Sequence, residues 1–278
     1  MRVKLVTSLN KQLYEKYAKD NFKSWVNYLY LPEGSEIEVW FNGEMPQGLP
    51  QRTNNGTPFK YKILDVQSEG WKYFISSYKN HPRPKAQPGQ EYMFNFVPFS
   101  CKVYALAEAS WDIKSQYTEN TGPANPFTHV IWVDADIELL QTVDETFLQK
   151  VAENSNFAWL DRSAPWTHGE TGFMMTTADP DTLDLFLQVA NCYGSGQLFH
   201  FAQWHDAFIY TAYLKLKAFT EPNFIVKNLN GDVNNESEQG LHPFKTSILS
   251  KVMRHDKGQL KFNKEAQQGK TFSEVVFN

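Results

Sequence analysis

The stretch HVIWVDADIELL, residues 129–140, decides the fold class of this 278-residue chain. Five mostly apolar residues, 129–133, run directly into two aspartates, Asp134 and Asp136. A short apolar run of this length is typical of a strand that is buried on both faces. Ligands of an open α/β sheet bind outside the carboxyl ends of its strands, which is where these two carboxylates would stand.

Strand-like and helix-like segments alternate along the rest of the chain. Further strands are expected at 2–8, 36–42, 157–161, 172–177 and 218–226. Helices are expected at 10–25, 66–79, 97–110, 203–216 and 245–253, from a Thr142–Glu145 capping box to Ala152, and after an N-cap at Asp179. Two segments rich in glycine, proline and asparagine, 42–60 and 79–90, are expected to be loops. The alternation predicts an α/β fold with a mixed, mainly parallel sheet flanked by helices.

Length and composition favour a single domain covering residues 1–278. The net charge is 27 − 31 = −4, so the overall charge gives no attraction to nucleic acid or to an anionic membrane. The two cysteines, Cys101 and Cys192, form no metal-binding pair, which fits a reducing compartment. No apolar run is long enough to span a membrane, and the first residues lack a signal-peptide core. We therefore expect a soluble, cytoplasmic protein.

The spacing of Asp134 and Asp136 indicates a cation site. One residue separates them, so in an extended chain both side chains leave the backbone on the same side. Two carboxylates this close repel each other, and a divalent cation between them removes the conflict. Oxygen ligands suit Mn²⁺ or Mg²⁺, which also bind substrate phosphates. The alternative is a turn in which each aspartate caps nearby backbone N–H groups.

A second motif, HDKGQLKF at 255–262, offers further groups for such a site. The imidazole of His255 is a suitable third ligand for Mn²⁺. Gly258 lets the backbone approach a phosphate closely, and Lys261 adds a positive charge for a diphosphate. The plainer interpretation is a solvated basic turn. His242 competes with His255 as a ligand but lacks the glycine and lysine spacing.

A D-x-D after a mid-chain strand, with a later H-x-x-G-x-x-K and an aromatic residue, resembles the GT-A glycosyltransferases, which use nucleotide sugars. The pattern is most similar to the retaining glycogenin and bacterial galactosyltransferase-like family, family eight. Other segments that agree in outline are VTSLN (6–10), FSCKVYAL (99–106), ETGFMMTT (170–177) and QWHDAFI (203–209). The outline covers nearly the whole chain, but only the two motifs are specific. The chain departs from the family at Phe262, where tryptophan is usual, and at Glu170, where an amide is more common.

The resemblance implies a set of donor-binding residues. Those that would contact the nucleotide or its diphosphate are Thr7, Ser8, Asn10, Lys102, Asp134, Gly258 and Lys261. Asp134 would chiefly meet the ribose, whereas Asp136 and His255 would hold the metal with it. The donor is expected to be a UDP-sugar, and Mn²⁺ or Mg²⁺ would act as a Lewis acid on the departing diphosphate.

Glu170 and Asp206 are the candidates for binding sugar hydroxyls or activating the acceptor. The alternatives are a surface turn for Glu170 and a charge placed against a helix dipole for Asp206. Trp166 and Trp204 could stack on a sugar or pack in the core. Retaining members of the family use an oxygen of the leaving phosphate as the base, so the reaction needs no protein nucleophile.

The resemblance also divides the chain into two halves. Residues 1–136 would form the nucleotide-binding half, and residues 137–278 the acceptor-binding half with the C-terminal motif. The acceptor is expected to be a hydroxyl of a glycan or polysaccharide, which is the default for this fold.

A 5-hydroxymethylated pyrimidine in phage DNA is a second expected acceptor, because the N-terminal and 99–106 segments also resemble phage-encoded proteins. The loop 79–90 is basic, and three aromatic residues, Trp71, Tyr73 and Tyr78, precede it. Its Arg83 and Lys85 could meet a phosphate backbone while an aromatic ring receives a flipped base. A solvated loop is the alternative.

Two other classes of protein stay open. A haloacid-dehalogenase-like phosphatase also carries D-x-D after a strand and uses the first aspartate as its nucleophile. That motif usually opens the fold, whereas 133 residues precede Asp134 here. The other class is a non-catalytic nucleotide-sugar-binding module, which would not need the His255, Gly258 and Lys261 set.

Overall fold

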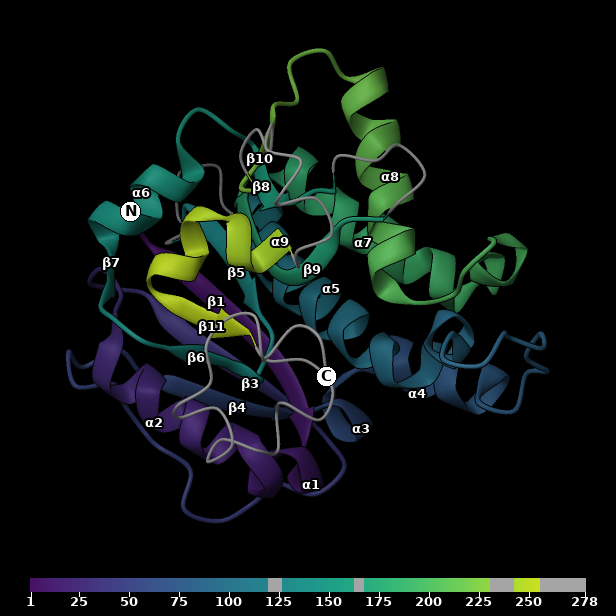
Figure 1. The fold of residues 1–278 in the computed structure, drawn as a ribbon, viewed down its shortest axis with the longest axis horizontal. Helices are drawn as coiled ribbons and strands as arrows, with labels where there is room; N and C mark the ends of the chain where they lie inside the picture. The colour runs from purple at the N-terminus through teal and green to yellow at the C-terminus, as the bar shows by residue number, and fades with distance from the viewer. Residues whose placement is uncertain (120–126, 163–167, 231–242, 256–278) are drawn as a thin grey trace.

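A seven-stranded sheet is the centre of the computed structural model, which describes residues 1–119, 127–162, 168–230 and 243–255 (Figure 1). Its strands are β1 (Val3–Asn10), β3 (Glu36–Asn42), β4 (Phe59–Ile63), β5 (His129–Val133), β8 (Phe157–Leu160), β9 (Glu170–Thr177) and β10 (Val226–Asn228). They lie in the order β10-β8-β9-β5-β1-β3-β4. The expected mixed, mainly parallel α/β sheet in a single domain is therefore confirmed.

One strand of this sheet, β9, runs against its neighbours. The pairs β1–β3, β1–β5, β3–β4 and β8–β10 are parallel, while β9 is antiparallel to both β5 and β8. In the register of β5 and β9, Val133 pairs with Phe173. The amino end of β9 therefore lies at the same edge of the sheet as the carboxyl end of β5, where the D-x-D begins.

Helices cover both faces of the sheet (Figure 1). On one face pack α4 (Glu69–Tyr78), α5 (Phe96–Glu119), α7 (Pro180–Gly194) and α8 (Asp206–Thr220). On the other pack α1 (Lys11–Leu13), a π-helix (Tyr14–Ala18), α2 (Lys19–Tyr28) and α6 (Glu145–Ala152). Alternate residues of β5 enter the two cores, Trp132 on one side and Val133 on the other. Burial on both faces explains why this strand reads as one continuous apolar run.

Short elements complete the described fold. They are α3 (Leu64–Gln67), α9 (Pro243–Thr246) and 3₁₀ helices at Glu91–Phe94, Gln197–His200 and Ile248–Lys251. Two small sheets pair β2 (Leu29–Tyr30) with β7 (Val143–Asp144), and β6 (Ile137–Leu139) with β11 (Met253–His255). The second pair is antiparallel and sets His255 opposite Ile137. It therefore brings the start of the C-terminal motif beside the D-x-D.

The structure corrects several expected elements. Strand β4 lies partly inside the expected loop 42–60, and β10 begins only at Val226 because α8 continues to Thr220. The expected helix at 245–253 is instead a helical turn, a 3₁₀ turn and β11. The cap of α6 is Asp144, whose side chain accepts a hydrogen bond from the Phe147 N–H, rather than Thr142. Elements of three to five residues are too short for their periodicity to separate them from turns.

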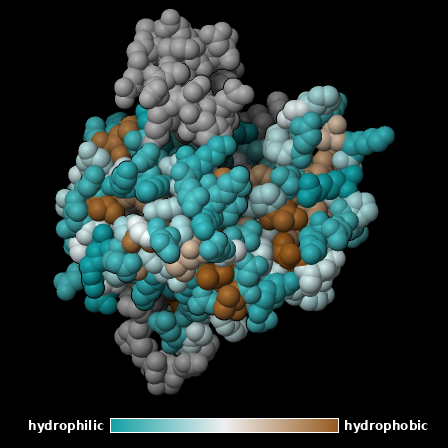
Figure 2. Space-filling model, turned by 90° about the horizontal axis from the view of Figure 1, so that it is seen from below, coloured by the Kyte–Doolittle hydropathy of each residue, from teal (hydrophilic) through white to brown (hydrophobic). Residues whose placement is uncertain are grey.

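Apolar residues do not form a membrane-spanning helix in the described part of the chain. None of the helices there is long and apolar enough to cross a bilayer. On the face shown in Figure 2, hydrophobic residues lie in small groups between hydrophilic ones.

Candidate metal centre and active site

The D-x-D lies in a tight turn at the carboxyl edge of the sheet. The backbone N–H of Asp134 donates to the carbonyl of Gly172 in β9 at 2.8 Å, and the N–H of Ile137 donates to the carbonyl of Asp134 at 3.0 Å. The second bond closes the turn that separates β5 from β6. Asp134 is thus fixed to β9 while Asp136 points toward β11. The backbone at the D-x-D is a turn and not the extended chain that the spacing of the two aspartates led us to expect.

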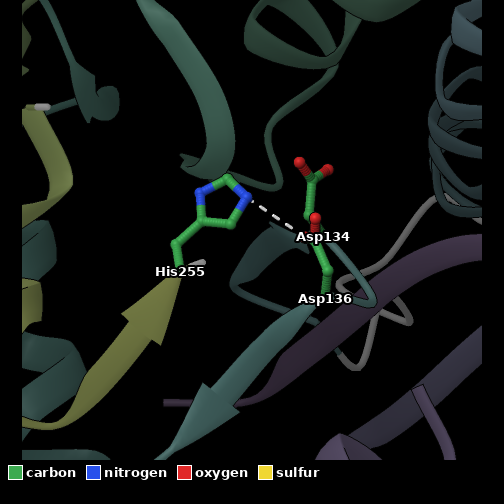
Figure 3. A group of neighbouring side chains, drawn as sticks. All are labelled: Asp134, Asp136 and His255. Atoms are coloured by element: carbon green, nitrogen blue, oxygen red, sulfur yellow. Dashed lines mark ion pairs between the residues drawn. The ribbon is translucent and has the colours of Figure 1, made fainter. Parts of the chain in front are cut away.

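His255 faces Asp136 across this turn (Figure 3). Its Nε2 lies 3.2 Å from Oδ1 of Asp136, and its side chain is 2% exposed. One potential ligand atom from each of Asp134, Asp136 and His255 lies within 4.8 Å of the others. Two carboxylates and an imidazole at this spacing form a donor set that fits Mn²⁺ or Mg²⁺.

Two donors orient the Asp134 carboxylate. Its Oδ1 accepts a hydrogen bond from the indole N–H of Trp132 at 2.7 Å and lies 2.9 Å from the Lys102 ammonium. Trp132 stands two residues earlier on the same strand, so its indole reaches the carboxylate on its own side of the sheet. Because both donors bind one oxygen, the plane of the carboxylate is set before any ligand arrives.

Lys102, which the resemblance implies would face the diphosphate, is buried between two aspartates. Its Nζ lies 2.9 Å from Asp134 and 2.8 Å from Oδ2 of Asp206, and it donates to the carbonyl oxygen of Thr171 at 2.9 Å. Burial alone would lower the pKa of Lys102, but the two carboxylates raise it. A lysine has three N–H donors, and here they are directed at oxygens of the protein itself.

Asp206 begins α8 and is also buried. Its Oδ2 accepts a hydrogen bond from the Thr171 hydroxyl at 2.8 Å in addition to the Lys102 contact. Burial would raise the pKa of Asp206, but the charge of Lys102 and the bonds it receives hold that pKa below its usual range. Asp206 therefore stays ionised and links the helix start to the D-x-D through Lys102.

Glu170 opens β9 beside this network. Its Oε1 accepts a hydrogen bond from the Gly172 N–H at 3.1 Å, and its Oε2 lies 3.7 Å from Arg162. It is 7% exposed, so it is a buried strand residue rather than part of a surface turn. The antiparallel direction of β9 is what brings this carboxylate to the same edge as the two aspartates.

The residues after β1 occupy different environments. Thr7 is fully buried, and its hydroxyl has no hydrogen-bond partner among the described residues. The side chain of Asn10 caps α1 by accepting from the Leu13 N–H at 2.8 Å, and Ser8 is half-buried. Of the three predicted nucleotide contacts, Ser8 and Asn10 are the ones with exposed surface.

Sequence reasoning missed three residues near the site. Tyr17 lies in the π-helix, where burial and then the charges of Asp136 and Asp134 raise its pKa. The imidazoles of His168 and His205 are 4.5 Å apart beside Asp206. Burial lowers the pKa of His205 to about 4 and lowers that of His168 as well, so both are neutral at pH 7. Tyr17 falls in the expected helix 10–25 and His205 in the quoted segment 203–209, but neither pattern marks these residues as part of a site.

Several predicted residues lie outside the described part of the chain: Trp166, His242, Gly258, Lys261 and Phe262. Trp204 packs in the core at 5% exposure, with its indole N–H donating to the Phe201 carbonyl at 3.1 Å.

In the loop 79–90, Arg83 lies over the ring of Phe96 at 5.3 Å. Trp71 is 4% exposed and belongs to the core, whereas Tyr73 is 59% exposed. The basic loop is therefore attached to the aromatic core of the α4–α5 face.

No protein-family profile matches this sequence, and no curated protein matches it. One solved structure of similar fold is a glycosyltransferase involved in the glycosylation of the major capsid of PBCV-1. It is 9% identical, with 96% of this chain and 100% of that chain covered and a TM-score of 0.41. Another is mouse xyloside xylosyltransferase 1 in its apo form, at 10% identity, 94% and 99% coverage and a TM-score of 0.48. At these values neither likeness assigns an activity, so the function rests on the site.

Proposed function

We propose that this chain is a metal-dependent glycosyltransferase of GT-A type that transfers a sugar from a nucleoside-diphosphate sugar to a hydroxyl acceptor. The observation that carries the proposal is the group formed by Asp134, Asp136 and His255 at the carboxyl edge of a mainly parallel sheet. These residues would hold Mn²⁺ or Mg²⁺, and the cation would stabilise the charge that develops on the leaving diphosphate.

The surrounding residues suit that chemistry. The bond between the anomeric carbon and the phosphate oxygen breaks, a bond to the acceptor oxygen forms, and the acceptor proton must reach a base. Lys102 and Trp132 hold Asp134 ready for the ribose or the metal. Because those contacts are made by the folded protein, they require no reorganisation during the reaction.

Glu170 and Asp206 are proposed to bind the hydroxyls of the transferred sugar or to help activate the acceptor. Both are ordered by protein donors at the same edge as the metal group. We also propose that the configuration of the transferred sugar is retained. In that case an oxygen of the leaving phosphate acts as the base and takes the acceptor proton. Gly258 and Lys261 would add contacts to that diphosphate.

The donor is proposed to be a UDP-sugar, with Ser8 and Asn10 at its nucleotide, while the fully buried Thr7 would lie beneath them in β1 without contacting the ligand. Residues 1–136 would supply most of the donor site and residues 137–278 most of the acceptor site.

A glycan hydroxyl is the acceptor that we favour over a 5-hydroxymethylated base, because the net charge of −4 gives no overall attraction to DNA. Of the three aromatic residues before the loop 79–90, Trp71 is buried in the core, whereas Tyr73 is exposed.

Sugar-nucleotide hydrolysis tests the proposal. Wild-type protein with Mn²⁺ is expected to release UDP from at least one UDP-sugar, and Asp136→Asn to lower that rate about 100-fold or more, since a metal Lewis acid contributes several kcal/mol. The matched control is Asp181→Asn, the same change at an exposed position in the first turn of α7. Equal rates for wild type and Asp136→Asn with Mn²⁺ would contradict the proposal.

The same assay separates the rival classes. A haloacid-dehalogenase-like phosphatase would release phosphate from a phosphomonoester without any sugar nucleotide, using Asp134 as its nucleophile. A non-catalytic module would bind the sugar nucleotide without releasing UDP.

A further inference from the structure

Gly172 of β9 is the point at which the parts of the proposed metal site meet. Its carbonyl oxygen accepts the Asp134 N–H at 2.8 Å, and its own N–H donates to Oε1 of Glu170 at 3.1 Å. It thus connects the D-x-D turn to Glu170 through backbone groups, which any residue at this position could supply. Its missing side chain is what distinguishes it.

The place that a side chain would take at position 172 is occupied by the His255 imidazole. A Cβ built there would lie 2.9 Å from Cε1 and 3.0 Å from Nδ1 of His255, and 3.3 Å from Oε1 of Glu170. Contacts below 3.0 Å are not tolerated, so one of the partners would have to move. His255 is the movable partner, since it ends the short strand β11 and its ring can rotate about its side-chain bonds.

A different glycine in the same segment shows the contrast. At Gly169 a Cβ would lie 2.2 Å from the ring of Trp159, which is 2% exposed and packed on all sides in the core. A methyl group there would press on the core itself. At Gly172 it would press on the imidazole of His255, a proposed ligand, and lie 3.3 Å from Oε1 of Glu170.

We propose that Gly172 is a positioning residue of the metal site: the absence of a side chain lets the His255 imidazole lie against β9, within reach of Asp134 and Asp136. This inference rests on the proposed function, because it assigns the three residues to a cation. It predicts that position 172 controls metal affinity through His255, with little effect on the stability of the sheet.

The test is a double-mutant cycle with Mn²⁺ as the probe. Gly172→Ala is expected to weaken Mn²⁺ binding about 10–100-fold, the usual cost of disturbing a group that orients a ligand. In a His255→Ala background, which leaves room for the methyl group, Gly172→Ala is expected to change the Mn²⁺ dissociation constant less than about twofold. Gly194→Ala, the same change in α7, is the matched control and is expected to bind Mn²⁺ as the wild type does.

Two results would overturn the inference. One is wild-type Mn²⁺ affinity in Gly172→Ala, and the other is an equal loss with and without His255, which would mean that position 172 acts through another group. If Gly172→Ala does not fold, the double variant with His255→Ala is expected to fold, and its failure would also overturn the inference.

Metal-free protein separates this inference from the proposed function. The imidazole NMR signals of His255, assigned by their loss in His255→Ala, are expected to move in Gly172→Ala but not in Gly194→Ala. Unmoved signals would overturn the positioning role. If the His255 signals move in Gly172→Ala but the wild-type protein binds no Mn²⁺, the packing of His255 against Gly172 is supported. The proposed metal-dependent function is then refuted.

Discussion

At the scale of single residues, Lys102 illustrates how the site balances its charges. The ammonium is 10% exposed and lies between Asp134 and Asp206, whose side chains are 24% and 3% exposed. The positive charge between the two carboxylates offsets their mutual repulsion. Lys102 therefore serves as an internal counter-ion, and the sequence could predict its charge but not the depth at which it is buried.

Removal of that counter-ion should cost stability. Lys102→Met is expected to lower the free energy of unfolding by about 3–5 kcal/mol, because breaking a buried ion pair leaves uncompensated charge. Urea unfolding monitored by tryptophan fluorescence is the measurement. Lys102→Met combined with Asp206→Asn removes one of the stranded charges and is expected to recover part of the loss. A stability equal to that of the wild type for Lys102→Met would show that the pair does not hold the site together.

The positions of the other site residues could be predicted from the sequence to different extents. Asp134 and Asp136 follow a strongly apolar strand, so their place at the sheet edge could be predicted. His168 and His205 could not be placed, because their approach depends on how α8 and β9 pack. For Glu170 the sequence leaves both a surface turn and a site residue open. The structure excludes the surface turn, because Glu170 is buried at the start of β9, whose antiparallel direction brings it to this edge of the sheet.

At the scale of elements, the pairing of β6 with β11 determines where His255 stands. Arg254 pairs with Glu138 in this register, and their side chains form a salt bridge at 2.6 Å. Strong apolar elements such as β1, β5 and α7 were predictable, since each carries a clear pattern or cap. The pairing of β11 was not, because three residues carry too little pattern to distinguish a strand from a helix.

The salt bridge between Arg254 and Glu138 is expected to make a small contribution to the pairing of β6 with β11. Arg254→Ala is expected to weaken the β6–β11 pairing by about 0.2–1 kcal/mol, as is typical of partly exposed ion pairs. If this whole free energy is lost from Mn²⁺ binding, the affinity falls at most about fivefold. Isothermal titration with Mn²⁺ is the measurement, and Lys251→Ala, an exposed charge in the preceding 3₁₀ turn, is the matched control. A loss shared by both variants would point to a general charge effect instead of strand pairing.

At the scale of the whole molecule, the sheet collects groups that are far apart in the sequence. Asp134 and Asp136 follow β5, Glu170 opens β9, Asp206 opens α8 and His255 ends β11. Parallel strands put their carboxyl ends on one edge, and the reversed β9 adds its amino end there. This topology gives one edge with several carboxylates, an imidazole and a buried lysine, and the proposed cation site rests on that arrangement.

We propose that a divalent cation and a nucleoside diphosphate bind this edge together. A thermal-shift panel of nucleoside diphosphates, with Mn²⁺ or with a chelator, measures whether they do. At 100 times its dissociation constant, UDP is expected to stabilise the protein by about 2.7 kcal/mol when Mn²⁺ is present, which is about 5 °C in Tm for a chain of this size. With the chelator, the shift should largely disappear. An equal shift in both conditions, or none for any nucleoside diphosphate with Mn²⁺, would contradict the account.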